Sequence, residues 1–382
     1  MRISKRSMGI VWCCVSLLVL GSLYTVEAQE TAWTKITPGP TSFMGRQLNP
    51  TCSGFPGTDP TFSFYVRQGS SRNLVIYFQG GGCCWNSQTC VTSPTYDPYI
   101  SEADNPANFP LGIGDFDNPE NPFADWSFVF IPYCTGDLHW GSGEWTYKYA
   151  TGQSWTIHHR GLDNFLTALK WTKLNLPRPK KILVTGSSAG AYGAIGNFPW
   201  VRKAFPASKI YVLGDAGIEV GPREFDAQAQ LLWNIDRPPW ASGMTEPMYL
   251  PEFLLTQARR HPRVRFGEYG NAWDSVLTWF RSAILQSFWV ATEEENVCED
   301  YNSNVLQTLE YKQQAENYRS YLASGISHTI LISPRFYTED SAGGVSFLSW
   351  VRAMIEGGEE WQNVACSGDC DKPDPCPLST DD

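Results

Sequence analysis

The segment Gly186-Ser187-Ser188-Ala189-Gly190 fits the pattern Gly-x-Ser-x-Gly. It follows a short apolar run that predicts a buried strand, and it precedes small residues that predict a helix. A sharp turn between strand and helix exposes the serine hydroxyl, and glycines are needed where the turn brings the backbone against neighbouring strands. We therefore interpret Ser188 as a candidate nucleophile for ester cleavage. A glycine-rich turn capped by a serine is the alternative interpretation.

A second glycine-rich segment, Gly80-Gly81-Gly82, follows the apolar run that ends at Gln79. An ester-cleaving serine needs backbone N–H donors for the negative oxygen that develops on the substrate, one of them from the residue after the nucleophile. Glycines allow such amides to turn inward without side chains in the way. We predict that the amides of Gly81, Gly82 and Ala189 form this oxyanion hole.

The base for such a serine is expected to be a histidine late in the chain, because this fold class orders its triad as Ser, then acid, then His. Only two of the five histidines, His261 and His328, follow Ser188. His261 lies in Arg-Arg-His-Pro-Arg, which is typical of a solvated loop. His328 lies in a turn beside an apolar run, so we predict His328 as the base.

Two aspartates compete for the role of orienting His328. Asp215 ends a predicted strand in Gly-Asp-Ala-Gly, and Asp274 lies in the loop after the predicted strand 264–269. Either position is acceptable for the acid of a triad. Order along the chain leaves the two near parity, with Glu268 a distant third.

Apolar spacing predicts strands that alternate with helices. Strands are expected at 61–67, 73–79, 126–132, 181–185, 209–213, 264–269 and 329–333. Helices are expected at 157–176, 275–289, 303–323 and 345–356. The first two strands are expected to form a hairpin or to be neighbours, and the Pro- and Trp-rich stretch 217–262 to hold a lid or cap at 233–240. This order predicts an α/β fold, with a mainly parallel sheet covered by helices on both faces.

The first 28 residues have the pattern of a secretory signal. Three positive residues precede an uncharged apolar stretch that ends at Leu23, and Val26-Glu27-Ala28 supplies small residues at a cleavage site. This apolar stretch is shorter than the roughly 20 residues of a spanning helix. We expect secretion after cleavage near Ala28, no stable membrane insertion, a catalytic domain over 29–365, and an acidic Cys- and Pro-rich tail over 366–382.

The chain is acidic, with 29 basic and 39 acidic residues and a net charge of −10. Without the predicted signal the net charge is −12. Nucleic acid is therefore excluded as a partner. A polyanion such as free polygalacturonate would also be repelled, unless a local basic patch overrides the global field.

Nine cysteines follow the predicted signal, and in an oxidising compartment they predict disulfides with one thiol left over. The spacing offers no paired Cys-x-x-Cys or Cys/His knuckles, so no zinc site is expected. The mature cysteines are Cys52, Cys83, Cys84, Cys90, Cys134, Cys298, Cys366, Cys370 and Cys376.

Several motifs in one order resemble the pectin acetylesterase and Notum family of α/β-hydrolases, over most of the mature chain. They are Gln79-Gly-Gly-Gly-Cys-Cys-Trp-Asn with Cys90, Ile131-Pro-Tyr-Cys-Thr-Gly-Asp137, His158-His-Arg-Gly161, the segment around Ser188, Gly-Asp-Ala-Gly217 and Ile-Ser-His328. The resemblance implies an α/β-hydrolase-like fold. It also implies that Asp274 is the acid, that His328 is the base, and that Asp215 is a neighbour in the floor of the site.

The resemblance further implies the disulfides Cys84–Cys90 and Cys52–Cys134, with Cys83 as an unusual extra cysteine. In the family an aromatic residue commonly follows the glycines just before the matched cysteine. The tripeptide at 81–83 departs from that pattern, which bears on the choice of substrate and leaves the triad undisturbed.

We expect a serine carboxylesterase that removes O-acetyl groups from a carbohydrate or polysaccharide, with no metal or organic cofactor. The 15 mature tryptophans supply rings that could stack on sugars, and the acidic charge favours a neutral or methyl-esterified polymer. The first alternative is removal of a longer fatty acyl group from a protein or lipid, which would need a deep apolar pocket, with Trp233–Phe253 a candidate to form it. The second is a non-catalytic binding module on a hydrolase fold.

Overall fold

The computed structural model describes most of the chain after its first 31 residues. The described residues are 32–149, 151–243, 249–289, 297–340, 344–366, Cys370, Pro373 and Cys376. The predicted signal peptide, 1–28, lies outside them, as does most of the predicted tail. No helix in the described part is both long and apolar enough to cross a bilayer.

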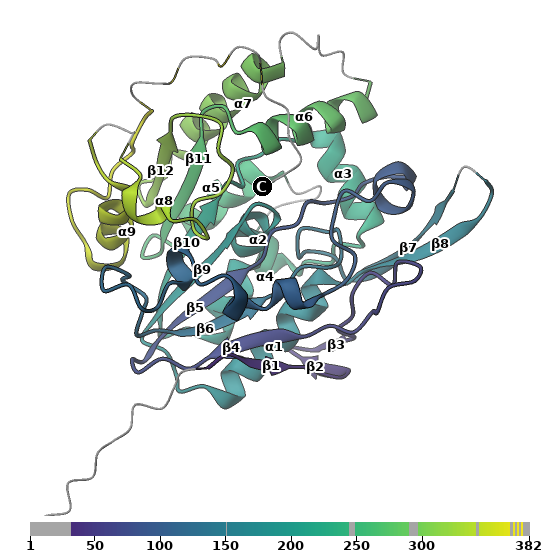
Figure 1. Ribbon diagram of the computed structural model, residues 1–382, viewed down its shortest axis with the longest axis horizontal. Helices are drawn as coiled ribbons and strands as arrows, with labels where there is room; N and C mark the ends of the chain where they lie inside the picture. Colours follow the sequence, from purple (N-terminus) through teal and green to yellow (C-terminus); the bar gives the residue numbers. More distant parts are fainter. Residues whose placement is uncertain are drawn as a thin grey trace, which may run out of the picture. The chain divides into compact units, whose positions relative to one another are not determined.

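Eight described strands form one sheet in the order β1-β4-β6-β5-β9-β10-β11-β12 (Figure 1). Its strands are β1 (Thr34–Ile36), β4 (Phe64–Arg67), β5 (Asn73–Phe78), β6 (Ser127–Ile131), β9 (Lys181–Ser187), β10 (Lys209–Asp215), β11 (Arg265–Asn271) and β12 (Tyr318–Ala323). From β6 to β12 every neighbouring pair is parallel, and β4 runs antiparallel to both of its neighbours. The mainly parallel sheet predicted from the sequence is thus confirmed.

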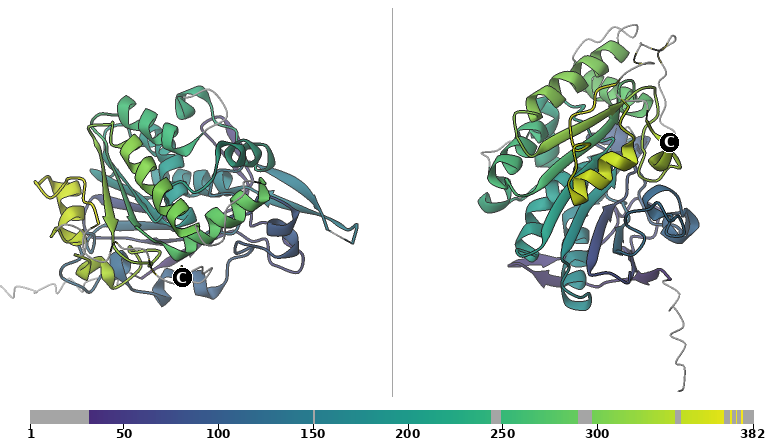
Figure 2. Two further views of the ribbon diagram at one scale, coloured as in Figure 1. Left: turned by 90° about the horizontal axis from the view of Figure 1, so that it is seen from above. Right: turned by 90° about the vertical axis from the view of Figure 1, so that its left-hand side faces the viewer.

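Helices cover both faces of this sheet (Figure 2). They are α1 (Gly161–Asn175), α2 (Ala189–Ala204), α3 (Arg223–Leu232), α4 (Pro239–Ser242), α5 (Leu250–Arg260), α6 (Ser275–Ser287), α7 (Val297–Lys312), α8 (Arg335–Thr338) and α9 (Phe347–Glu356). Along β5, Leu74 and Ile76 join the core beneath α1 and α2, whereas Val75 and Tyr77 join the core beneath α9. Successive side chains point to opposite faces, so a strand buried on both faces is apolar throughout.

Smaller elements complete the described chain. Two hairpins lie outside the main sheet, β2 (Thr41–Phe43) with β3 (Arg46–Leu48) and β7 (Gly143–Lys148) with β8 (Ser154–His159). Short helical turns are η1 (Gln88–Thr92), η2 (Glu102–Asp104), η3 (Pro106–Asn108) and η4 (Gly112–Gly114). The hairpin partner β8 occupies the start of the helix predicted at 157–176, which begins only at Gly161.

The predicted pairing of 61–67 with 73–79, as a hairpin or as neighbouring strands, is wrong. β6 lies between the two strands, antiparallel to β4 and parallel to β5. β6 is apolar and buried on both faces, so it needs a hydrogen-bonded neighbour on each side. Closeness in sequence favoured the hairpin, and this second pairing requirement overrides it.

Two predictions near residue 320 are also wrong. The helix predicted at 303–323 ends at Lys312, and Tyr318–Ala323 is β12, parallel to β11. The strand predicted at 329–333 is a turn, in which Ile330 and Leu331 are fully buried. In both cases an apolar run reflects burial, and periodicity alone does not separate a buried strand from a helix or a buried loop.

The Pro- and Trp-rich stretch 217–262 folds into α3, α4 and α5, with 244–248 outside the described residues. Within the portion predicted as a lid or cap, Trp233 is fully buried and donates its indole N–H to the carbonyl of Cys84 at 3.0 Å. This contact fixes the end of α3 against the chain that follows the triple-glycine segment.

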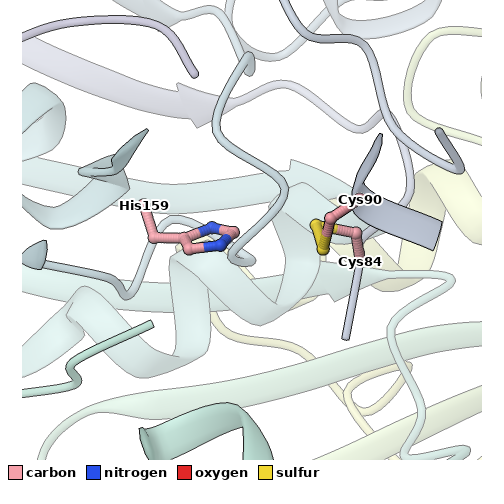
Figure 3. Close-up of side chains that lie close together, drawn as sticks. All are labelled: Cys84, Cys90 and His159. Atoms are coloured by element: carbon pink, nitrogen blue, oxygen red, sulfur yellow. A yellow bond between two sulfur atoms is a disulfide. The ribbon is translucent and has the colours of Figure 1, made fainter. Parts of the chain in front are cut away.

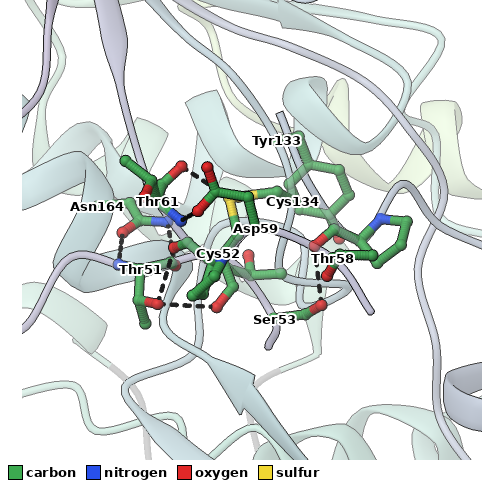
Figure 4. The surroundings of a disulfide bond; sticks show 12 residues. Thr51, Cys52, Ser53, Thr58, Asp59, Thr61, Tyr133, Cys134 and Asn164 are labelled. Atoms are coloured by element: carbon green, nitrogen blue, oxygen red, sulfur yellow. Dashed lines mark hydrogen bonds between the residues drawn. A yellow bond between two sulfur atoms is a disulfide. The ribbon is translucent and has the colours of Figure 1, made fainter. Parts of the chain in front are cut away.

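The disulfides Cys52–Cys134 and Cys84–Cys90, implied by the family resemblance, are confirmed. Beside Cys52, the side-chain amide of Asn164 on α1 exchanges hydrogen bonds of 2.8 and 3.0 Å with the backbone of Thr51 (Figure 4). Cys298–Cys376 and Cys366–Cys370 are also bonded, and Cys83 is the free, buried cysteine of the described part. The segment around Thr51 and Cys52 is thereby fastened to α1 and to the chain that follows β6.

Candidate active site

Ser188 sits in a strained turn between β9 and α2. Its φ of 56° and ψ of −126° lie in a region that residues with a Cβ rarely adopt. A Cβ on Gly186 would lie 2.4 Å from the carbonyl oxygen of Phe78, and one on Gly190 would lie 2.0 Å from the same oxygen. The two glycines are therefore required by close packing against β5, as the sequence pattern predicts. The turn leaves Ser188 7% exposed at the carboxyl end of the sheet.

His328 and Asp274 form a buried pair at the same end. His328 Nδ1 lies 2.8 Å from Asp274 Oδ2, and neither side chain is more than 3% exposed. The other carboxylate oxygen of Asp274 accepts the backbone N–H of Leu277 at 2.9 Å and so caps α6. The N-terminus of α6 thus fixes the carboxylate of Asp274, and this carboxylate orients the imidazole of His328. Asp274 follows β11 and His328 follows β12, as triad order requires.

Asp215, the competing candidate for the acid, makes other contacts. Its fully buried carboxylate accepts the Ser187 hydroxyl at 2.6 Å and the backbone N–H groups of Ile330 and Leu331 at 2.9–3.1 Å. Its carbonyl accepts the N–H of Ser188 at 2.7 Å. Asp215 therefore joins the turn that carries Ser188 to the loop that carries His328. Burial raises the pKa of this carboxyl to about 6, and its hydrogen bonds and His328 oppose the rise.

The remaining sequence candidates lie elsewhere. Glu268 is buried in an ion pair with Lys312, at 2.6 Å, and accepts the Tyr318 hydroxyl at 2.6 Å. His261 follows α5 and lines a groove formed by the first residues of β9 and β10, whereas Ser188 follows the last residue of β9. Neither residue is part of the cluster around Ser188.

The triple-glycine segment lies directly against Ser188. A Cβ on Gly80 would lie 3.0 Å from the Ser188 Cβ, and one on Gly82 would lie 2.1 Å from the carbonyl oxygen of Thr95. Gly81 and Gly82 have φ values of 131° and 72°, which favour glycine. Ala189 begins α2, so its N–H has no acceptor within the helix. Gly82 also forms an isolated antiparallel bridge with Tyr96.

Two depressions meet at Ser188. The inner pocket, about 440 Å³ including the solvent at its mouth, has apolar walls of Phe225, Leu277, Phe280 and Ile284. The outer cleft, about 1150 Å³ measured in the same way, lies between the segment Gly81–Asp97 and the start of α6, which contributes Trp279. A serine at the junction of two depressions can place an acyl group in one and an alcohol in the other.

Two buried carboxyls line the inner pocket, and sequence reasoning missed both. Glu219 Oε1 accepts the N–H of Gly221 at 2.7 Å, while Asp226 Oδ2 has no hydrogen-bond partner among the described residues. Burial raises the pKa of Glu219 to about 7 and raises that of Asp226 well above its usual range, with Glu219 adding to the second shift. The one available signal was that Glu219 closely follows the end of β10. Burial also raises the pKa of the Cys83 thiol in the same pocket.

The side chains of Cys84, Cys90 and His159 come within metal-ligating distance of one another in the described part of the chain (Figure 3). The two sulfurs are bonded to each other. Both ring nitrogens of His159 are also engaged, Nδ1 with the carbonyl of Thr135 and Nε2 with the Tyr147 hydroxyl, each at 2.8 Å. These side chains are therefore engaged within the fold, close in sequence to the triple-glycine segment, which ends two residues before Cys84.

Known proteins share sequence features with the part of the chain that carries this site. Residues 48–234, which include Ser188 and the triple-glycine segment, match the family model of pectinacetylesterases. Over this part of its length the chain is similar to the pectinacetylesterases. The α/β-hydrolase-like fold expected from the resemblance agrees with this similarity and with the mainly parallel sheet.

Individual relatives match over a limited region. Palmitoleoyl-protein carboxylesterase NOTUM of Schmidtea mediterranea is 28% identical over 40% of this chain and 29% of its own length. Palmitoleoyl-protein carboxylesterase notum2 of Xenopus laevis is 30% identical over 36% of this chain and 28% of its own. Pectin acetylesterase 11 of Arabidopsis thaliana is 25% identical over 42% and 41%. The chain thus spans less than half the length of these relatives.

The raised pKa of Glu219 predicts a pH-dependent stability term. Between its ordinary value of 4.5 and about 7, Glu219 is protonated in the folded chain and ionised in the unfolded chain. Folding then takes up a proton, so this contribution to the free energy of unfolding is present below pH 4.5 and is lost as the pH rises to 7. Glu219→Gln removes the term, and we expect the variant to gain stability over wild type between pH 4 and pH 8, by at most about 3 kcal/mol.

Chemical denaturation of both proteins at several pH values measures this difference. The amide oxygen of the variant can still accept the N–H of Gly221, so the neighbouring turn is retained. Parallel pH profiles for wild type and variant would show that Glu219 ionises normally.

Proposed function

We propose that the protein is a serine carboxylesterase in which Ser188 is the nucleophile, His328 the base and Asp274 the acid. The observation that carries the proposal is the 2.8 Å contact between His328 and Asp274 at the sheet edge where the strained turn presents Ser188. Similarity to pectinacetylesterases and to Notum carboxylesterases supports the same class of chemistry. The non-catalytic alternative has no comparable support, because a binding module has no need of this buried pair.

In the proposed reaction His328 takes the proton of Ser188 as the serine oxygen attacks the ester carbonyl. The amides of Gly81, Gly82 and Ala189 stabilise the negative oxygen of the tetrahedral intermediate. Asp274 stabilises the imidazolium and keeps the ring oriented. The proton then passes to the leaving alcohol. In the second half of the reaction water takes the place of the alcohol: His328 removes a proton from water as it attacks the acyl-enzyme, and returns that proton to Ser188. The mechanism requires no metal or organic cofactor.

We propose that the substrate is an O-acetylated carbohydrate. The mature enzyme would act on it after secretion. The outer cleft would receive the sugar, because it is lined by the half-buried Trp279 and by Tyr96. Aromatic rings of this kind offer an apolar face to a pyranose while leaving the hydroxyls hydrated. Pectin acetylesterase 11 is a relative whose name carries this activity.

A second candidate is hydrolysis of a longer fatty acyl ester, the activity named for the NOTUM relatives. The apolar walls of the inner pocket favour it. The carboxyls of Glu219 and Asp226 oppose it, because an alkyl chain packed against them would leave buried polar groups without hydrogen bonds. We therefore rank acetyl above long acyl groups.

Replacing Ser188 tests the proposal most directly. Ser188→Ala should lower kcat on p-nitrophenyl acetate by about 10⁴-fold or more, while circular dichroism and the melting temperature change little. A fluorophosphonate probe should label wild type and spare the variant. Undiminished turnover by Ser188→Ala would remove the assignment.

The two aspartates should respond differently to removal of their charge. Asp274→Asn should lower kcat by about 10⁴-fold, because the amide cannot stabilise the imidazolium and favours the wrong tautomer. Asp215→Asn keeps an acceptor for the N–H groups of Ile330 and Leu331, so its kcat should fall far less. Steady-state kinetics on the same ester compare them, and the reverse order of losses would exchange their roles.

Acyl chain length separates the two candidate substrates. With p-nitrophenyl esters from two to sixteen carbons, kcat/KM should peak at acetate and fall steadily, because longer chains must approach the pocket carboxyls. Ser188→Ala supplies the blank at every length. A peak at eight carbons or longer would select the fatty acyl ester instead.

A further inference from the structure

The largest depression among those described lies at the amino end of the sheet, away from Ser188. This amino-end groove has a volume of about 1980 Å³, including the solvent at its mouth. Lys181, Lys209 and Arg265, which line it, are the first residues of β9, β10 and β11. Ser187 and Asp215 are the last residues of β9 and β10, so the groove and the candidate active site lie at opposite ends of the same strands.

The groove is strongly basic on an acidic protein. Two acidic residues, Glu316 and Glu356, line it, against seven basic ones. Its net charge is thus +5 with His261 neutral, and because the whole chain carries −10, the remainder carries −15. Positive charge is therefore concentrated here against the overall balance. The basic residues are Lys181, Arg202, Lys209, Arg260, Arg263, Arg265 and Arg319.

Three of these cations form a row at the starts of the neighbouring strands β9, β10 and β11. Lys181 and Lys209 are register partners on β9 and β10, and Arg263 lies two residues before Arg265, the first residue of β11. Neighbouring strands lie about 4.8 Å apart. This interval is close to the length of one sugar unit in a linear polysaccharide. A chain that crosses the strands could present one carboxylate to each cation.

The positive charges are not neutralised within the fold. None of the seven forms an ion pair with a carboxylate among the described residues, whereas Arg46, Arg160 and Arg281 elsewhere each do. Arg265 is fixed by the carbonyls of Ala353 and Met354, at 2.9 and 2.7 Å. Burial lowers the pKa of His261, and the nearby charges of Arg202 and Arg260 lower it further. The guanidinium groups of Arg202 and Arg260 thus lie close enough to act on the imidazole of His261.

Helix ends explain only part of the charge. Arg202 and Arg260 lie in the last turns of α2 and α5, where positive side chains complement the helix dipole. Lys181, Lys209 and Arg263 begin or precede strands, which have little dipole to complement. Lys209 and Arg263 are also exposed residues of the groove. Helix ends therefore do not account for these two positions.

We propose that the amino-end groove binds a linear polyuronate, a polysaccharide with one carboxylate on each sugar. Arginine and lysine would pair with successive carboxylates, with arginine able to form two parallel hydrogen bonds to each. The site is separate from Ser188 and would hold the polymer without reacting with it. The positive charge of the groove would attract such polymers locally, although the negative charge of the whole chain predicts repulsion. Binding here does not depend on the proposed esterase activity.

Polygalacturonate oligomers of about ten sugars, a length that outspans the row of cations, are the probe. Isothermal titration calorimetry on the folded protein should detect binding that weakens as salt is raised. The double variant Lys209→Glu/Arg263→Glu should bind at least about tenfold more weakly. The control Lys148→Glu/Lys173→Glu changes net charge equally at exposed sites on β7 and α1, and should bind within about twofold of wild type.

Hydrolysis of p-nitrophenyl acetate should be the same in wild type and both variants, which shows that each is folded and keeps this test separate from that of Ser188. Equal losses of binding in the two variants would show a general charge effect and overturn the proposal. Absence of binding by wild type would also overturn it. Binding of heparin but not of polygalacturonate would overturn the polyuronate assignment, because it would require sulfate groups.

Discussion

The buried carboxylate of Asp215 is the contact on which the geometry around Ser188 depends. Ser188 and His328 belong to segments 140 residues apart that share no strand, and Asp215 binds the residue before the first and the residues just after the second. An isolated buried charge would be costly, and here a hydroxyl and two backbone N–H groups satisfy it. The same contact explains why the chain from Ile330 to Leu331 can be buried without belonging to a sheet.

Much of the fold follows from local pattern, and most of the errors arise where a partner is remote. Predicted strands at 73–79, 181–185 and 209–213 are confirmed within two residues, because runs buried on both faces of a parallel sheet have few alternatives. The sequence pattern predicts a helix at β12, because the apolar residues of this strand face two different cores. The N–H groups of Ile330 and Leu331 pair with a side chain 115 and 116 residues away, which no local pattern reveals.

Part of the candidate site could be predicted from local sequence patterns. Motif order brings Ser188, Asp274 and His328 to the carboxyl ends of neighbouring strands, yet it left Asp215 and Asp274 near parity. Geometry separates them, because Asp274 contacts the imidazole while Asp215 contacts backbone. Glu219 and Asp226 carried no motif, and only the packing of α3 against the segment after β10 brings their carboxyls into one pocket. The net charge likewise did not predict the basic groove, because it is a sum over the whole chain.

The seven residues of β9 separate the basic amino-end groove from the candidate active site. At ~3.3 Å per residue this separation is about 20 Å. A polymer retained at one end of this strand would remain close enough for its unbound sugars to diffuse to the other end. Retention of this kind raises the effective concentration of reactive groups into the millimolar range for a short flexible tether. Turnover on long chains would then depend on tether length and ionic strength, while turnover on single sugars would depend on neither.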